Sequence, residues 1–376
     1  MNGWQEIKLG DVATITAGGD APKNAFSKTK TDEFAIPVYS NGITDKGLYG
    51  YTNKATITKP ATTISARGTI GAVFRRTEPY LPIVRLISVI GNEEIVDSDF
   101  LYYALCNQRI EGDGSVQAQL TVPMISNYCI TIPSLQTQKR IARILSSLDD
   151  KIEANKLINR NLEEQAKAIF KSWFVDFEPF QEGEFVDSEL GRIPKGWKVG
   201  RLADIADITM GQSPSGDSYN EDGEGTVFYQ GRGEFSDRFP VRRLYTTEPK
   251  RMAKAGDVLL SVRAPVGDIN VANEKCCVGR GLAAITAKKG YSSFLLYTLK
   301  MNQAQFDQYN GAGTVFGCIN KDALNDLKTL VPSETIVFSY ENIVHPLDEQ
   351  YLLNSEENKR LASIRDTLLP KLMSKK

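Results

Sequence analysis

Residues 136–175 form a stretch without glycine or proline that limits the fold of this chain more than any other segment. Apolar residues and two asparagines recur alternately four and three positions apart, as in the seam of a helix that packs along another helix. These residues are Ile141, Leu145, Leu148, Ile152, Asn155, Asn159, Leu162, Ala166, Ile169 and Trp173. Forty residues make a rod of about 60 Å, which is longer than one small domain needs. The stretch therefore predicts a spacer helix between two bodies.

A second seam follows 199 positions after the first. Its residues are Tyr340, Val344, Leu347, Tyr351, Asn354, Asn358, Leu361, Arg365, Leu368 and Leu372. One such stripe is typical of an ordinary core-facing helix, but two matched stripes predict that the helices pair. The stripe is interrupted at His345-Pro346 and at Arg365, so we expect this helix to be kinked or to start late.

Asparagines lie near the middle of both seams, and an antiparallel pair that crosses at its midpoint would bring them together. Buried seam asparagines cost stability but fix register and orientation. We therefore expect ten helix-pairing residues: Leu148, Ile152, Asn155, Asn159, Leu162, Leu347, Tyr351, Asn354, Asn358 and Leu361.

The bodies that precede the two helices also repeat. Trp4, Leu9, Asp11, Ala13, Ile15 and Gly18 recur as Trp197, Leu202, Asp204, Ala206, Ile208 and Gly211, all 193 positions later. Both bodies continue with short strand-like segments, a helix, a glycine turn at 112–116 or 311–315, and a last strand ending at Pro133 or Pro332. The sequence thus predicts an internal duplication of the α+β class.

These patterns predict five parts along the chain. Residues 1–135 form the first body and 136–175 its helix, while 176–196 are a polar, proline- and glycine-rich linker. Residues 197–335 form the second body and 336–376 the second helix.

Composition excludes several classes of protein. The single histidine and five cysteines without a C-x-x-C spacing argue against a zinc site and a disulfide framework. Neither a P-loop nor the Asn/Asp-Pro-Pro-aromatic signature of amino-methyltransferases occurs. We expect no catalytic residues, metal or cofactor. Because there is no signal-peptide pattern and no long apolar run, we expect a cytoplasmic protein without a membrane partner.

The net charge of −1 does not favour nucleic-acid binding, but one stretch is locally basic. Residues 232–254 carry seven Lys and Arg against three Asp and Glu, a difference of +4. The basic residues are Arg232, Arg238, Arg242, Arg243, Lys250, Arg251 and Lys254. A nucleic-acid surface and a solvated loop both fit this composition.

Two segments carry a resemblance to a known family. The sequence KSWFVDFEPF at 171–180 and the connector DSELGRIPKGW at 187–197, with the order body, helix, body, helix, resemble the specificity subunit of type I restriction-modification enzymes. The strand-then-glycine segments at 65–71 and 260–267 are similar to the same family. The resemblance covers essentially the whole chain.

The resemblance implies a DNA-recognition subunit without its own catalytic site. Each body would be a target recognition domain for one half of a split, asymmetric sequence in double-stranded DNA. The helices would set the spacing and pair as an antiparallel coiled coil. They would also dock two DNA methyltransferase subunits, with restriction and translocase subunits in the full enzyme.

Candidate DNA-binding residues follow from that reading. Loop residues that differ between the bodies and present bidentate donors suit base contacts, since Arg matches guanine and Asn or Gln matches adenine. Arg67 and Arg263 are shared, which favours phosphate contacts, although each could equally be a surface salt-bridge partner. The full set of candidates is Asn41, Arg67, Thr69, Gln230, Arg232, Arg242 and Arg263.

Two other functions stay open at this point. The chain could be the recognition module of a type II enzyme that fuses methylation with cleavage. It could also be a two-ended protein scaffold that does not bind DNA, which its near-neutral charge would suit.

Overall fold

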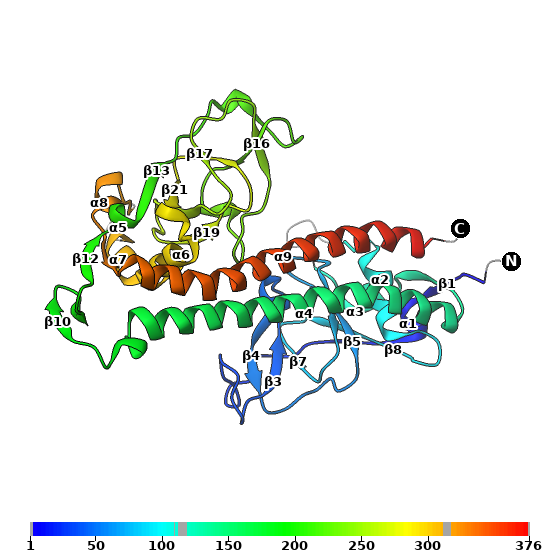
Figure 1. The fold of residues 1–376 in the computed structure, drawn as a ribbon. Coiled ribbons are helices and arrows are strands. Elements are labelled where there is room, and N and C mark those ends of the chain that lie inside the picture. The colour runs from blue at the N-terminus through cyan, green and yellow to red at the C-terminus, as the bar shows by residue number, and fades with distance from the viewer. Residues whose placement is uncertain (1–2, 109, 112–118, 311–316, 375–376) are drawn as a thin grey trace. The chain divides into compact units, whose positions relative to one another are not determined.

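The computed structural model describes residues 3–108, 110–111, 119–310 and 317–374 (Figure 1). It divides into two compact units: residues 1–154 with 357–376, and residues 155–356. The glycine turns predicted at 112–116 and 311–315 lie outside the described residues. No helix in the described part of the chain combines the length and apolar character that crossing a bilayer requires.

In its described residues, the body of the first unit has three small sheets and short helices. Its four-stranded sheet has the order β2-β8-β5-β6 and its three-stranded sheet the order β4-β3-β7, while β1 pairs with β9. The strands are β1 (Gln5–Lys8), β2 (Ala13–Ala17), β3 (Ile36–Tyr39), β4 (Leu48–Thr52), β5 (Ala61–Ile64), β6 (Val73–Arg76), β7 (Leu81–Pro82), β8 (Ile87–Gly91) and β9 (Cys129–Ile132). The helices are α1 (Leu9–Val12), α2 (Ser98–Cys106) and α3 (Val122–Ser126).

The second unit repeats this body with additional strands. Its sheets have the orders β13-β21-β18-β19, β14-β16-β15-β20-β17, β12-β22 and β10-β11. The strands are β10 (Phe185–Ser188), β11 (Gly191–Pro194), β12 (Lys198–Arg201), β13 (Ala206–Met210), β14 (Tyr219–Asn220), β15 (Thr226–Tyr229), β16 (Leu244–Thr246), β17 (Met252–Ala253), β18 (Val258–Ser261), β19 (Ile269–Val271), β20 (Cys276–Val278), β21 (Leu282–Ala287) and β22 (Lys328–Val331). The helices are α5 (Leu202–Ile205), α6 (Ser292–Met301), α7 (Gln303–Asp307) and α8 (Lys321–Asn325).

The two bodies match at the level of strand register. Ile87 in β8 is paired with Ala17 and Ile64, and Ala283 in β21 is paired in the same way with Met210 and Leu260. The parallel pair β3·β7 also has its counterpart in β15·β20. This agreement confirms the internal duplication and the α+β class predicted from the sequence.

Two long helices complete the units, α4 (Leu135–Phe174) and α9 (Glu334–Leu372). Within the second unit, the first half of α9 lies against α6 and the second half of α4, where Phe170 packs on Tyr340 with ring centroids 5.9 Å apart (Figure 1). Within the first unit, leucines near the end of α9 pack on the core of that body together with Leu145 of α4. In each unit the early part of one helix meets the late part of the other, so the pairing is antiparallel as predicted.

The second long helix excludes one of the two alternatives expected for it, a late start. α9 starts at Glu334 and passes through Pro346 without a break, so it does not start late. A proline inside a helix removes one hydrogen bond and costs about 3 kcal/mol. Pro346 itself faces solvent, whereas Val344 and Tyr351 on either side are buried. The free energy gained by burying the seam residues therefore outweighs the cost of a proline inside the helix.

Candidate nucleic-acid interface

Strand ends meet at one edge of the body in the first unit. We define the first strand-end edge as residues 18–19, 40–42, 65–71 and 83–86, which follow β2, β3, β5 and β7. The amide N–H of Ile83 donates to the carbonyl of Tyr39 (2.9 Å), and the N–H of Gly18 donates to that of Leu86 (2.8 Å). These backbone bonds hold loops from distant parts of the sequence together on rigid strands.

Asn41 ties three of these loops together. Its Nδ2 donates to the carbonyl of Val84 (2.6 Å), and its Oδ1 accepts from the N–H of Ala66 (2.7 Å). The hydroxyl of Thr69 donates to the Asn41 carbonyl at 3.4 Å. Both ends of the Asn41 amide are therefore used inside the unit. In this structure the Asn41 side chain connects neighbouring loops. The DNA-base contact expected of Asn41 stays a prediction.

The second strand-end edge comprises residues 211–213, 230–232, 262–268 and 279–281, at the corresponding place in the second unit. The N–H of Gly279 donates to the carbonyl of Tyr229 (2.8 Å), and the N–H of Val262 to that of Gly281 (2.9 Å). Gln230 is exposed at this edge. Its side chain makes no hydrogen bond to any other residue in the described ranges, so its amide is available to a ligand.

The shared arginines occupy equivalent loops. Arg67 follows Ser65 and Arg263 follows Ser261, and both loops close with a 3.0 Å bond from a glycine N–H, that of Gly71 or Gly267, to the serine carbonyl. Both glycines have positive φ, 80° and 101°, which explains the need for glycine. The Arg67 guanidinium donates to Gln119 at 3.1 Å. Arg263 is exposed and has no side-chain partner among the described residues.

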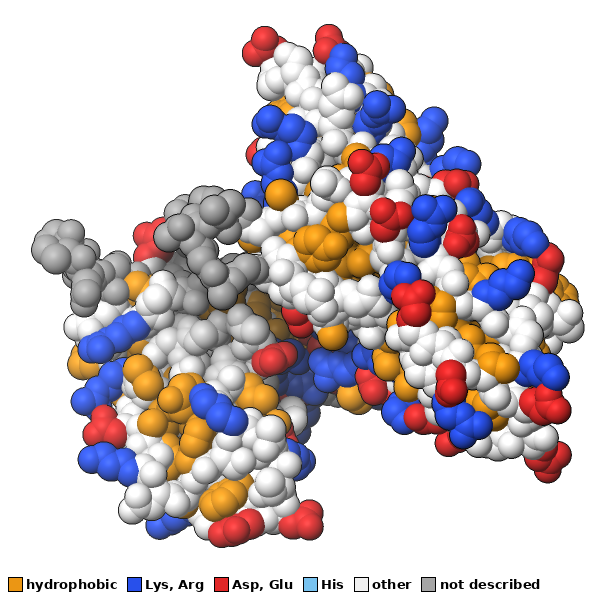
Figure 2. All heavy atoms as spheres, turned by 90° about the vertical axis from the view of Figure 1, so that its left-hand side faces the viewer, with side chains coloured by type: hydrophobic (Ala, Val, Ile, Leu, Met, Phe, Trp, Pro, Cys, Tyr) orange, Lys and Arg blue, Asp and Glu red, His pale blue; other side chains and the backbone are white. Residues whose placement is uncertain are grey.

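The locally basic stretch at 232–254 is less basic in the fold than in the sequence. Arg232 pairs with Asp268 (2.6 Å) and Arg242 with Glu274, two carboxylates outside the stretch. Arg238 is only 4% exposed and pairs with Asp348 of α9. On the face that Figure 2 shows, Lys and Arg side chains are intermixed with Asp and Glu side chains. Six of the seven basic side chains are exposed and two of those six are paired, so a nucleic-acid surface and a solvated loop both stay open for this stretch.

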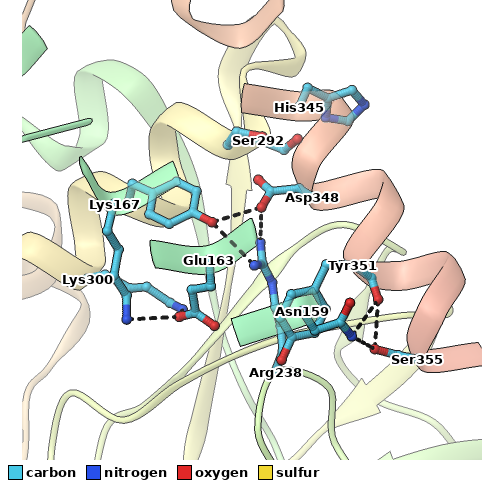
Figure 3. A network of polar contacts seen from close by, with 12 residues as sticks. Asn159, Glu163, Lys167, Arg238, Ser292, Lys300, His345, Asp348, Tyr351 and Ser355 are labelled. Atoms are coloured by element: carbon cyan, nitrogen blue, oxygen red, sulfur yellow. Dashed lines mark hydrogen bonds and ion pairs between the residues drawn. The ribbon is translucent and has the colours of Figure 1, made fainter. Parts of the chain in front are cut away.

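Arg238 belongs instead to a buried polar network inside the second unit (Figure 3). Its Nη1 donates to the Tyr297 hydroxyl (3.3 Å), which in turn donates to Asp348 (2.9 Å). The guanidinium also lies 4.7 Å from the ring centroid of Tyr351. Burial would lower the pKa of Arg238, but Asp348 raises it above its usual range. We infer that this network joins α9 to the body.

The helix seams are also polar in part. Within the second unit, Asn354 Nδ2 donates to Asn159 Oδ1 (2.9 Å), and Asn159 Nδ2 donates to the Tyr351 carbonyl (3.2 Å). Asn155 is fully buried, while Asn358 is partly buried. The other expected pairing residues are apolar: Ile152 is buried, and Leu148, Leu162, Leu347 and Leu361 are partly buried.

Arg365 interrupts the apolar seam for a reason that the sequence does not reveal. Within the first unit its Nη1 donates to Asp149 of α4 at 2.6 Å. Burial would lower the pKa of Arg365, but the hydrogen bonds to Asp149 and Asp366 raise it above its ordinary value. The arginine thus serves as a pairing residue through an ion pair.

Two polar side chains that join the long helices to their bodies were not predicted from the sequence. Gln138, 1% exposed, accepts from the N–H of Asp97 (2.9 Å) and joins α4 to its body. Glu341 accepts from the N–H groups of Ser293 and Phe294 (3.0 and 3.1 Å) at the start of α6. Gln138 continues the seam three positions before Ile141, so a buried polar residue there was detectable. Glu341 gave no such signal.

The chain matches one protein family over most of its length. The family model described as the type I restriction modification DNA specificity domain matches residues 1–164 and 194–363. Within the described residues, no group of three or more His, Cys, Asp or Glu could hold a metal ion.

Individual relatives agree with the family match. A protein of Methanocaldococcus jannaschii, provisionally named as the specificity subunit of type I restriction enzyme MjaX, is 36% identical over 67% of this chain. The match covers 56% of that protein. The MjaIX specificity subunit of the same organism is 28% identical over 98% of this chain and 92% of its own length. A crystal structure of a type I S subunit from M. genitalium has a TM-score of 0.67 at 18% identity and covers 98% of this chain and 96% of its own, a likeness of fold.

Proposed function

Because the chain belongs to the type I restriction modification DNA specificity family, we propose that it is the sequence-reading subunit of a type I restriction-modification complex. Residues 1–135 and 197–335 are then the two target recognition domains, each for one half of a bipartite, asymmetric DNA target. The most direct support for this proposal is that the two bodies share the same strand register, whereas the residues at their strand-end edges differ. A shared scaffold with different loops suits two unrelated half-sites.

The long helices carry the second part of the proposal. Residues 136–175 and 336–376 set the distance between the half-sites and dock DNA methyltransferase subunits, two in number, while 176–196 are a linker. Catalysis of methylation, translocation and cleavage belongs to the partner subunits. Exposed Ile158, Phe338 and Leu353 on the long helices are candidates for docking contacts.

Binding of the chain by itself should be weak. The near-neutral net charge supplies little energy from counterion release, and three of the seven basic residues in the stretch 232–254 are paired with carboxylates. A gel shift with duplex DNA, with and without the cognate methyltransferase subunits, tests this. Tight specific binding by the chain alone at physiological salt would contradict the dependence on partners.

The spacing role is tested by lengthening both helices. Seven extra residues, one heptad, in each of α4 and α9 should separate the domains by roughly 10 Å. At ~3.4 Å per base pair this is about three base pairs. Methylome sequencing should show the same half-sites with a longer gap. Seven residues inserted in the linker 176–196 serve as the control, and there the gap should not change. An unchanged gap in the helix variant would rule out the spacing role.

The rival functions predict other results. A fused type II enzyme would modify DNA as a single chain, and a scaffold without DNA contacts would give no methylation pattern that follows its domains. Exchange of residues 197–335 for those of another specificity subunit separates these cases. We expect one half of the recognised sequence to change and the other to stay.

A further inference from the structure

One turn occupies the same structural position in both recognition domains. It joins β7 to β8 in the first unit and β20 to β21 in the second. The N–H of Leu86 donates to the carbonyl of Ile83, and the N–H of Leu282 donates to that of Gly279, both at 3.0 Å. The second residue of this turn is Val84 in one domain and Arg280 in the other. We call these two the turn-tip residues.

Both turn tips are exposed on a fixed backbone. Val84 is 48% exposed, and its N–H donates to Gly19 (2.8 Å) while its carbonyl accepts from Asn41. Arg280 is exposed, and its N–H donates to Ser213 Oγ (3.3 Å). Side chains held on such pinned turns can contact a ligand at a defined position.

The glycines beside Arg280 bring the backbone unusually close to its neighbours. A Cβ on Gly279 or Gly281 would lie 2.9 Å from the carbonyl oxygen of Gln230. The Arg280 side chain therefore stands between two residues without side chains. It makes no ion pair or hydrogen bond to any residue in the described ranges, while Asp268 of the same edge is already paired with Arg232.

Val84 is held in a conformation that its side chain disfavours. Its φ is 53° and that of Arg85 is 64°, in the left-handed region that β-branched residues rarely occupy. Strain of this kind persists where the surroundings impose it and is concentrated at functional sites. A valine that is 48% exposed buries only part of its side chain in return for this strain.

Comparison of the two domains separates phosphate contacts from base contacts. Contacts to phosphate carry no sequence information, so a shared position such as Arg67 and Arg263 suits them. The turn-tip position has the same place between the strands of both domains, but its side chain is apolar in one domain and cationic in the other, and its φ is positive only at Val84. We propose that the turn-tip residues determine specificity, with Val84 packing on a thymine methyl group and Arg280 donating to O6 and N7 of guanine.

This inference rests on the proposed function, and the test keeps the two apart. Complexes of the chain with its methyltransferase subunits are measured for binding to duplexes with each half-site randomised in turn. If the parent complex shows no sequence preference, the proposed function fails. If the parent is selective, the variants decide the role of the turn tips.

Arg280→Ala should flatten the preference at one G·C position of the second half-site by roughly 5- to 150-fold and leave the first half-site unchanged. Arg280→Lys keeps the charge but loses the bidentate fork, so it should flatten the same position. Replacement of that guanine by 7-deazaguanine should weaken the parent and leave Arg280→Ala unaffected. Arg263→Ala is the control and should weaken all sequences alike. Equal weakening by Arg280→Ala across all sequences, or no effect, would overturn the assignment.

Val84→Gly removes the side chain and relieves the positive φ, so the fold should be at least as stable, as a melting curve would show. Replacement of one thymine by uracil in the first half-site should weaken the parent roughly fourfold, about 0.8 kcal/mol for one methyl group. Val84→Gly should not respond to that replacement. Equal sensitivity of parent and variant to every uracil would refute the contact.

Discussion

The buried pair of Arg238 and Asp348 gives a sharp prediction about stability. The two side chains are 4% and 14% exposed. Asp348→Asn would leave the guanidinium buried without a counterion, which costs about 3–5 kcal/mol in comparable pairs. Arg238→Met should cost a similar amount because the carboxylate then loses its partner.

Replacement of both charges should be far less harmful than replacement of either. Arg238→Met with Asp348→Leu still leaves the hydroxyl of Tyr297, which is 0% exposed, without either hydrogen-bond partner. An unsatisfied hydroxyl costs about 1–3 kcal/mol. The triple variant that adds Tyr297→Phe should therefore come within about 1 kcal/mol of the parent, since an apolar replacement of a buried pair is often neutral.

Urea unfolding followed by tryptophan fluorescence measures these free energies. The chain has three tryptophans, and a Trp4→Phe background leaves Trp173 and Trp197, which both lie in the second unit. Arg243→Met is the matched control, because Arg243 is exposed and should change stability by less than about 0.5 kcal/mol. A cost below about 1 kcal/mol for Asp348→Asn, or a triple variant as unstable as the single ones, would refute the reasoning.

Three further outcomes are expected. Gly18→Ala should destabilise the first unit by about 1–3 kcal/mol, because its Cβ would lie 2.6 Å from the backbone of Pro82; Gly19→Ala, with nothing within 4 Å, should be neutral in the same melting experiment. At pH 8 a thiol reagent should modify only the exposed Cys129 and Cys318 quickly, and fast modification of a third thiol would contradict the fold. Burial raises the pKa of Glu163, but the ion pair with Lys300 outweighs this effect and lowers the pKa below its ordinary value of 4.5. The ionised Glu163 therefore stabilises the folded state above pH 4.5, and this stabilisation is lost as the pH falls through the lowered pKa. Glu163→Gln should reduce the acid sensitivity of the second unit, measured by urea unfolding from pH 7 to pH 3.

Repeating features of the fold were predictable from the sequence, because periodicity and internal offsets depend only on residue order. The paired helices and the duplicated α+β bodies are of this kind. The interior position of Arg238 was not predictable, since a charge count along the chain cannot tell which cations fold inward. Likewise, the side chain of Asn41 is of a type that suits a DNA-base contact. Its two hydrogen bonds were not predictable, because they are made to loops that lie 25 and 43 positions away in the sequence.

Pro346 is a second case in which the local sequence alone gives the wrong expectation. Local propensity argues against a helix at that residue, yet burial of Tyr340, Val344 and Tyr351 is decided by partners elsewhere in the second unit. Packing over the whole seam determines the outcome. The turn-tip residues are also invisible in the sequence, because their equivalence appears only when strand registers of the two bodies are compared.

The end of α9 has a consequence for the order in which the protein is made. Leu368, Leu369 and Leu372 pack on the core of the first unit, although ribosomes add them only after the whole second unit. At about 5–20 residues per second, the roughly 200 intervening residues take about 10–40 s. During that time the nascent first unit exposes the apolar surface that these leucines later cover. A nonsense mutation near residue 357 would therefore impair the domain that was synthesised first and leave the later one largely intact.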